Sequence, residues 1–179
     1  DVSGVIKSVV ILRDITEKKY VCSGLDWFEI GRSDGVRGQN SLSWEKREQD
    51  CDGFNDSNHE SYVNGWYAGI NDFCSETNCF AFGRSGQKYL NVCPSGKEQR
   101  FLASYRKGMK IYLYERDNRN IAEQLQALTD QASDEKEPQE VPNILKRINE
   151  LETRLEFNRA LISEINREID ESLSQSTVL

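Results

Sequence analysis

The sequence has one histidine, three prolines and no pair of cysteines in a C-x-x-C spacing. A structural zinc site needs about four ligands at such close paired spacings, so we expect no zinc site. No run of about eighteen apolar residues is present, which excludes a helix that crosses a bilayer. The formal net charge of −7 disfavours nucleic acid as a partner, because phosphates are bound by clusters of Lys and Arg. No signal peptide is visible, and a mature chain would show none.

Two short segments resemble ligand loops but do not fit them. The acidic segment 50–56 fails the calcium-loop pattern in every register, because that pattern needs alternating Asp and Asn, a glycine and a glutamate at position twelve. The tripeptide Ser95-Gly96-Lys97 lacks the upstream glycine and the downstream hydroxyl of a phosphate loop. We therefore expect no cofactor and no metal.

Cysteine, by contrast, is plentiful and confined to the first 93 residues. Clustered cysteines in a small, loop-rich region are typical of disulfides formed in an oxidising compartment. The five cysteines are Cys22, Cys51, Cys74, Cys79 and Cys93. The odd count leaves one thiol, which is either free or paired between chains.

The first 94 residues predict short elements. The β-branched segment 5–12 predicts a strand, and a short helix is expected over about 42–51. Ser57 and Glu60 have the spacing of a capping box, which predicts the start of a helix. Aromatic residues and glycines recur together at helical spacing in three segments, which predicts close helix contacts around 27–35, 62–69 and 105–108. The segments 80–83 and 87–92 predict a β-hairpin.

From Ser95 onward the sequence predicts one long helix, which ends near residues 131–133. Its second half carries a heptad seam, and a second set of heptads follows a charged, proline-containing linker over 133–142. If the chain folds back near Pro138, Asn118 lies opposite Asn158, the polar interruption of the other seam. A buried amide pair lowers stability but sets the register, so we predict an antiparallel helical hairpin. Opening of this hairpin to pair with a second copy remains an alternative.

The predicted fold class is α+β and mostly α. A strand segment over 1–21 precedes a disulfide-pinned head of short helices and a β-hairpin over 22–112. The antiparallel helical hairpin, or arm, covers 113–173, and a flexible tail covers 174–179.

The motifs of the head resemble a family of small Gram-negative envelope lipoproteins known only as a domain of unknown function. The resemblance covers about 22–114, and the tail resembles the charged coil that often follows in that family. The residues that carry it are Asp26, Trp27, Gly31, Asp34, Gly35, Gly38, Cys51, Tyr62, Gly65, Gly69, Phe73, Cys74, Phe82, Gly83, Arg84, Ser85, Gly86, Tyr89, Val92, Cys93, Pro94, Phe101, Tyr105, Gly108 and Tyr112.

The resemblance implies a periplasmic protein with a signal peptide and a lipid-bearing cysteine upstream of Asp1, anchored by default in the outer membrane. This chain departs from the family at Cys79, where glycine is usual, and that extra thiol leaves the pairing open. We favour Cys74 with Cys93 and Cys22 with Cys51. The family has no assigned chemistry, so it implies no catalytic residue.

We expect a non-catalytic lipoprotein that acts as a structural or adaptor component of an envelope assembly, through contact of its arm with an envelope protein or through self-association. A self-contained hairpin explains the heptads equally well. The alternative is a head that binds a carbohydrate or small ligand, with Trp66, Tyr67 and Arg84 as the candidate surface. A cell-wall hydrolase is disfavoured, because His59 is expected at the surface and no carboxylate pair stands out among 30 acidic residues.

Overall fold

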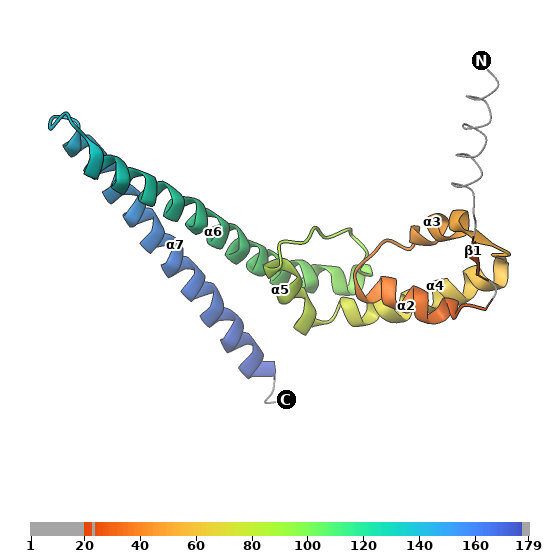
Figure 1. The fold of residues 1–179 in the computed structure, drawn as a ribbon. Coiled ribbons are helices and arrows are strands. Elements are labelled where there is room, and N and C mark those ends of the chain that lie inside the picture. Colours follow the sequence, from red (N-terminus) through yellow and green to blue (C-terminus); the bar gives the residue numbers. More distant parts are fainter. Residues whose placement is uncertain (1–19, 23, 177–179) are drawn as a thin grey trace, which may run out of the picture. The chain divides into compact units, whose positions relative to one another are not determined.

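The computed structural model describes residues 20–22 and 24–176, which are mostly helical (Figure 1). The strand predicted over 5–12 lies outside the described residues. In chain order the elements are β1 (Tyr20–Val21), α2 (Trp27–Val36), α3 (Ser43–Asp50), β2 (Cys51–Asp52), α4 (Asp56–Phe73), α5 (Glu76–Arg84), α6 (Ser95–Asp134) and α7 (Val141–Ser176).

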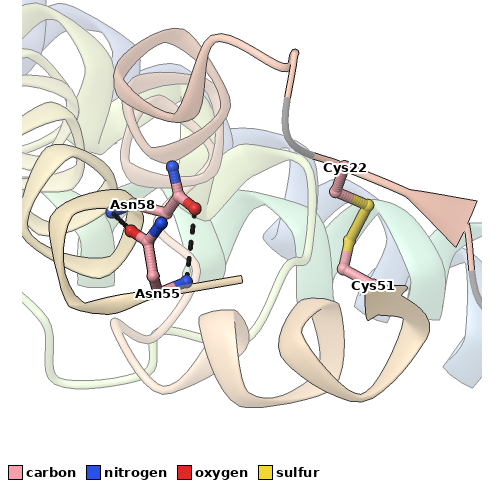
Figure 2. Close-up of a disulfide and its surroundings, with 4 residues drawn as sticks. All are labelled: Cys22, Cys51, Asn55 and Asn58. Carbon is pink, nitrogen blue, oxygen red and sulfur yellow. Dashed lines mark hydrogen bonds between the residues drawn. A yellow bond between two sulfur atoms is a disulfide. The ribbon is translucent and has the colours of Figure 1, made fainter. Parts of the chain in front are cut away.

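The two short strands pair in parallel, with Tyr20 opposite Cys51. A disulfide between Cys22 and Cys51 lies beside this pairing (Figure 2). Two residues a strand are too few to hold a sheet by themselves, so the covalent bond is what keeps the segment before α2 next to the end of α3.

The predicted β-hairpin is wrong. Residues 80–83 form the last turns of α5, and residues 87–92 are a loop without strand pairing. The alternation of Phe80 and Phe82 suggested a strand, but Cys79 and Gly83 lie four apart and are the buried residues of a helix face. The loop turns at Gly86, whose φ of +73° is strained for residues with a side chain.

The capping box of α4 also differs from the predicted one. Asn55 is the N-cap, in extended conformation, and its side chain accepts from the amide of Asn58 at 2.9 Å. The side chain of Asn58 accepts in return from the amide of Asn55 at 3.2 Å (Figure 2). The helix therefore begins at Asp56, and Ser57 lies in its first turn. Asparagine fills both places because its short amide oxygen can accept the reciprocal bond.

The chain divides into two compact units. The first contains the described residues up to Ser75 together with Tyr89–Pro94, and the second contains Glu76–Lys88 and the residues from Ser95 onward. The predicted boundary between head and arm, after residue 112, falls inside α6 and stays a prediction.

In the first unit, α2 and α4 pack with their backbones in contact. Four glycines form this contact, and a methyl group on any of them would overlap a backbone carbonyl oxygen of the facing helix. They are Gly31 and Gly35 on α2 and Gly65 and Gly69 on α4. Glycine in a helix lowers stability by about 1 kcal/mol relative to alanine, and the close packing of the two helices offsets that loss.

In the second unit, α5 and the first part of α6 repeat this contact. Gly83 faces the carbonyl of Tyr105, and Gly108 faces the carbonyl of Phe80. The turn after each leading helix repeats as well, since Gly38 and Gly86 both have positive φ and lie against an aromatic ring, that of Phe73 or Tyr112.

The two helix pairs correspond residue by residue. On the leading helix and its turn, Gly31, Asp34, Gly35, Gly38 and Gln39 occupy the places of Cys79, Phe82, Gly83, Gly86 and Gln87. On the following helix, Tyr62, Gly65, Trp66, Gly69 and Phe73 occupy the places of Phe101, Ser104, Tyr105, Gly108 and Tyr112. Each pair also has a hydrogen bond at corresponding positions. Trp66 Nε1 donates to the carbonyl of Gln39, and the Tyr105 hydroxyl donates to the carbonyl of Gln87, both at 2.8 Å.

The arm is an antiparallel pair formed by α6 and α7, joined by residues 135–140 (Figure 1). The connection is shorter than the predicted linker because Pro142 fits in the first turn of α7, where a helix does not need its amide. Along the seam, Ile111, Ile121, Leu128 and Ile144 are buried. Their burial against the facing helix is what stabilises two helices with mostly charged outer faces.

Candidate functional site

Asp34 is the only charged side chain of the described residues that is buried, with 2% of its surface exposed. Oδ1 accepts from Nη2 of Arg37 at 2.5 Å and of Arg47 at 2.8 Å. Oδ2 accepts from Nε of Arg47 at 3.0 Å and from the Tyr62 hydroxyl at 2.8 Å. Four bonds fill the acceptor capacity of one carboxylate.

Each partner of Asp34 comes from a different place in the chain. Arg37 follows the end of α2, Arg47 lies on α3 and Tyr62 lies on α4. No described residue of α3 is buried, and its side chains reach the α2–α4 pair through the two bonds from Arg47 and through Trp44, whose ring lies 4.2 Å from that of His59 on α4. The cluster therefore helps to hold α3 in place.

The charges of the cluster stabilise one another. Burial alone would raise the pKa of Asp34, but the hydrogen bonds from Arg47, Tyr62 and Arg37 outweigh it and hold the pKa below its ordinary value. Burial and the bond to Asp34 raise the pKa of the Tyr62 phenol. At neutral pH the site thus contains a carboxylate, a neutral phenol and two guanidinium groups.

A polar hollow with a volume of about 320 Å³ opens beside this cluster. Besides Asp34 and its two arginines, it is lined by Gln39, Ser43, Lys46 and Asp50. Lys46 has no ion-pair partner among the residues that the structure describes. The hollow therefore collects three cationic and two acidic side chains.

The comparisons with known proteins identify the part of the chain that contains this site. Residues 26–110 match the family model described as a protein of unknown function (DUF2799). This stretch is similar to that family, and we call residues 26–110 the DUF2799 domain below. No curated protein and no solved structure matches the chain.

The DUF2799 domain contains the glycines that join the helices of both pairs and all the residues of the Asp34 cluster. Sequence reasoning singled out Asp34 as a motif residue but missed its partners. Arg47 lies 13 residues away on another helix, so no local periodicity connects it with Asp34. Tyr62 was singled out as a motif residue and as the start of the segment 62–69, but not as a partner of Asp34.

The described residues form the disulfides Cys22–Cys51 and Cys74–Cys93, the two favoured pairs, and Cys79 is free and buried. Cys22 lies just before the residues that the family model matches. The second bond joins the end of α4 to the loop before α6, not the two ends of a hairpin. The Cys79 thiol donates to the carbonyl of Glu76 at 3.0 Å, and burial raises its pKa. A buried thiol with a raised pKa is a poor nucleophile at neutral pH.

The candidate ligand surface of the domain consists of three residues with different surroundings. The Trp66 indole is 7% exposed and its N–H is bonded, so the exposed ring is that of Tyr67, at 61%, which lies edge-on to Trp66. Arg84 belongs to the other unit, where it pairs with Glu115 at 3.2 Å. His59 is half-buried, with its ring 4.2 Å from that of Trp44.

Beyond the DUF2799 domain, Asn118 and Asn158 meet across the arm. Nδ2 of Asn158 donates to Oδ1 of Asn118 at 2.9 Å and to Asp117 at 2.8 Å. Arg154 pairs with the same aspartate at 2.6 Å. The polar interruption of the seam is therefore a bonded network that links α6 to α7 in one register.

The described residues have neither a metal-binding cluster nor a membrane-spanning helix. No group of three or more His, Cys, Asp or Glu side chains there could hold a metal ion. None of the described helices combines the length and the apolar character needed to cross a membrane.

Proposed function

We propose that this chain is a non-catalytic adaptor of the bacterial envelope. In this proposal it is a periplasmic lipoprotein, held at the outer membrane by an N-terminal lipid, whose arm docks on another envelope protein. The lipid and the compartment follow from the resemblance of its head to envelope lipoproteins, and the two disulfides agree with an oxidising compartment.

The uneven charge of the chain carries the proposal. Residues 113–173 hold 15 acidic and 8 basic residues, a net charge of −7, whereas the rest of the chain holds 15 of each. The arm therefore accounts for the whole net charge of the protein. An acidic helical arm favours a partner with a basic surface, and the attraction speeds encounter at low ionic strength.

One flank of the arm also exposes large apolar side chains. Phe157 is 63% exposed and Leu113 is 41% exposed. Phe157 follows Arg154 by three residues and Leu113 precedes Asp117 by four, so both lie on the flank where the Arg154–Asp117 pair joins the helices. An exposed aromatic residue within a charged surface is typical of a residue that anchors a partner.

The non-catalytic part of the proposal is supported by the state of the nucleophilic groups. The one free thiol of the described residues, Cys79, is buried, and His59 packs against Trp44. The alternative of an aromatic ligand platform loses the Trp66 indole, which is buried and bonded. Self-association through the arm is the competing explanation of the same surface.

The experiment is photo-crosslinking in envelope membranes, beside a size measurement of the purified chain. The crosslinking residue replaces Glu123 or Glu152, both exposed on the arm, and replaces Glu60 on α4 as the matched control. We expect one envelope protein to crosslink from the arm positions but not from Glu60. The crosslink yield should fall as salt is raised, because added salt shortens the Debye length from about 8 Å at physiological ionic strength and so weakens the attraction between exposed charges.

A matched pair of substitutions then tests the anchor. Phe157→Gln should lower the crosslink yield without changing the unfolding midpoint, whereas Leu42→Gln, at a residue 57% exposed outside the arm, should change neither. If only copies of this chain crosslink to one another, the adaptor proposal is wrong and the arm serves self-association. No crosslink from a monomeric chain would leave the arm as a structural hairpin.

A further inference from the structure

The hollow beside Asp34 has a basic lining in a part of the chain that is neutral overall. Arg37, Lys46 and Arg47 contribute three positive charges, and Asp34 and Asp50 contribute two negative ones. Arg37 and Arg47 are 58% and 39% exposed, so both guanidinium groups reach solvent although Asp34 does not. The local excess of charge is positive.

Asp34 holds the two guanidinium groups but leaves most of their donors free. Arg37 donates to Asp34 through Nη2, and Arg47 donates to it through Nε and Nη2. In the part of the chain that the structure describes, no acceptor outside the Asp34–Tyr62 cluster binds either group. A guanidinium has five N–H donors, so each arginine retains donors for a ligand.

The second helix pair shows that a buried carboxylate is not needed to form this fold. Phe82 and Phe101 take the places of Asp34 and Tyr62, with ring centroids 6.4 Å apart, and the same glycine contacts form around them. Burying a carboxylate has a desolvation cost that an aromatic pair avoids. The charged cluster is therefore not needed for the contact between α2 and α4, although Arg47 also uses it to hold α3.

We propose that this hollow is an anion-binding site for the phosphate group of a ligand, with Arg37 and Arg47 as donors and Lys46 as a supporting charge. Two guanidinium groups can donate to the oxygens of a phosphate. Because Asp34 already holds both side chains in place, phosphate binding costs less side-chain entropy. The volume of about 320 Å³ suits a small phosphorylated molecule or the headgroup of a phospholipid.

The first experiment uses the full chain with its disulfides and inorganic phosphate as the probe. Phosphate is titrated at constant ionic strength, with chloride as the exchanged anion, while the Arg Nε–H signals are followed by NMR. We expect a saturable shift of the Arg37 and Arg47 signals in the millimolar range. Equal, non-saturable shifts of all arginines would mean general ion screening and would overturn the proposal.

Two substitutions five residues apart form the matched pair, since Arg32 lies in α2 and Arg37 directly follows it. Arg37→Gln should weaken phosphate binding about tenfold, because one charged donor is lost while Arg47 still neutralises Asp34. Arg32→Gln changes the net charge equally, but Arg32 pairs with Glu29 and Asp72 and does not line the hollow. It should leave the affinity unchanged, and equal weakening by both variants would refute the site.

Sedimentation with vesicles of neutral lipid, with and without an anionic phospholipid, distinguishes the two sources of the phosphate. Binding to anionic vesicles that Arg37→Gln abolishes and free phosphate displaces would assign a lipid headgroup. Phosphate binding without vesicle binding would assign a free ligand. Absence of both would overturn the proposal, and none of these results depends on crosslinking from the arm.

Discussion

The α2–α4 pair and the α5–α6 pair have the same backbone contacts but different centres. In both, glycines let the helices touch, and a glycine with positive φ lies against an aromatic ring. The first encloses Asp34, bonded to two arginines and a tyrosine, whereas the second encloses Phe82 against Phe101. The contact between helices is thus independent of what fills the space beside it.

The comparison also separates structural from functional residues. Features that recur in both pairs, such as Gly35 with Gly83 and Gln39 with Gln87, are explained by packing and turn geometry. Features of one pair alone need another explanation. Asp34 with its arginines is such a feature, and the exchange of Gly31 for Cys79 is another.

Alanine at the shared glycines should have the largest effect and should test whether the two contacts are equivalent. Gly35→Ala and Gly83→Ala each place a methyl group against a backbone carbonyl, which cannot move as a side chain can. We expect each to lower the free energy of unfolding by about 3 kcal/mol or more. Gly96→Ala, a helical glycine with nothing within 4 Å, is the control and should not destabilise. The urea unfolding midpoints of the three variants measure these effects. If only Gly83→Ala has a small effect, the two helix contacts are not equivalent.

Removal of a disulfide should affect the pairs unequally, because both bonds lie in the first unit. The double substitution Cys22→Ala and Cys51→Ala opens a loop with a sequence separation of 29 residues and should lower stability by about 3 kcal/mol. Hydrogen exchange should become faster in α2, α3 and α4 and stay unchanged in α5 and α6. Faster exchange throughout would show that the two units unfold together.

Substitutions at the two corresponding centres should differ in size. Asp34→Asn weakens the charged hydrogen bonds from Arg37 and Arg47 and should lower the free energy of unfolding by about 2 kcal/mol. Phe82→Leu keeps an apolar side chain of similar size in the corresponding place and should lower the free energy of unfolding by about 1 kcal/mol. Thermal unfolding measures both, and an equal loss would mean that the charged cluster is no more demanding than the aromatic one.

Acid should have the smallest effect, and only the first pair should respond. The pKa of Asp34 is lower in the folded than in the unfolded chain, so the unfolded chain takes up the proton first as the pH falls. The stability from this group is present above about pH 4 and is lost as the pH falls through the folded pKa. The difference in urea midpoint between wild type and Asp34→Asn should therefore shrink from pH 7 to pH 3. The deficit of Phe82→Leu serves as the control and should not change with pH.

Much of this protein follows from its sequence because the signals are local or periodic. The long helix from Ser95 and the antiparallel arm were predicted from heptads, and the register followed from one polar position in each seam, Asn118 and Asn158. The glycine-rich helices were predicted to need close neighbours, which they have. The hairpin was wrong because a short apolar segment such as 80–83 fits either period, and its packing against α6 decides for the helix.

The sequence by itself determined the glycine-rich helices, the long helix from Ser95, the arm and the absence of a C-x-x-C zinc motif, since each depends on residues close together along the chain. Only the tertiary structure decided the correspondence of the two helix pairs and the Asp34 cluster. Both depend on contacts between helices, where Arg47 and Tyr62 reach Asp34 from 13 and 28 residues away. No local pattern records such a contact, because burial and hydrogen bonding between helices are set by how the helices pack.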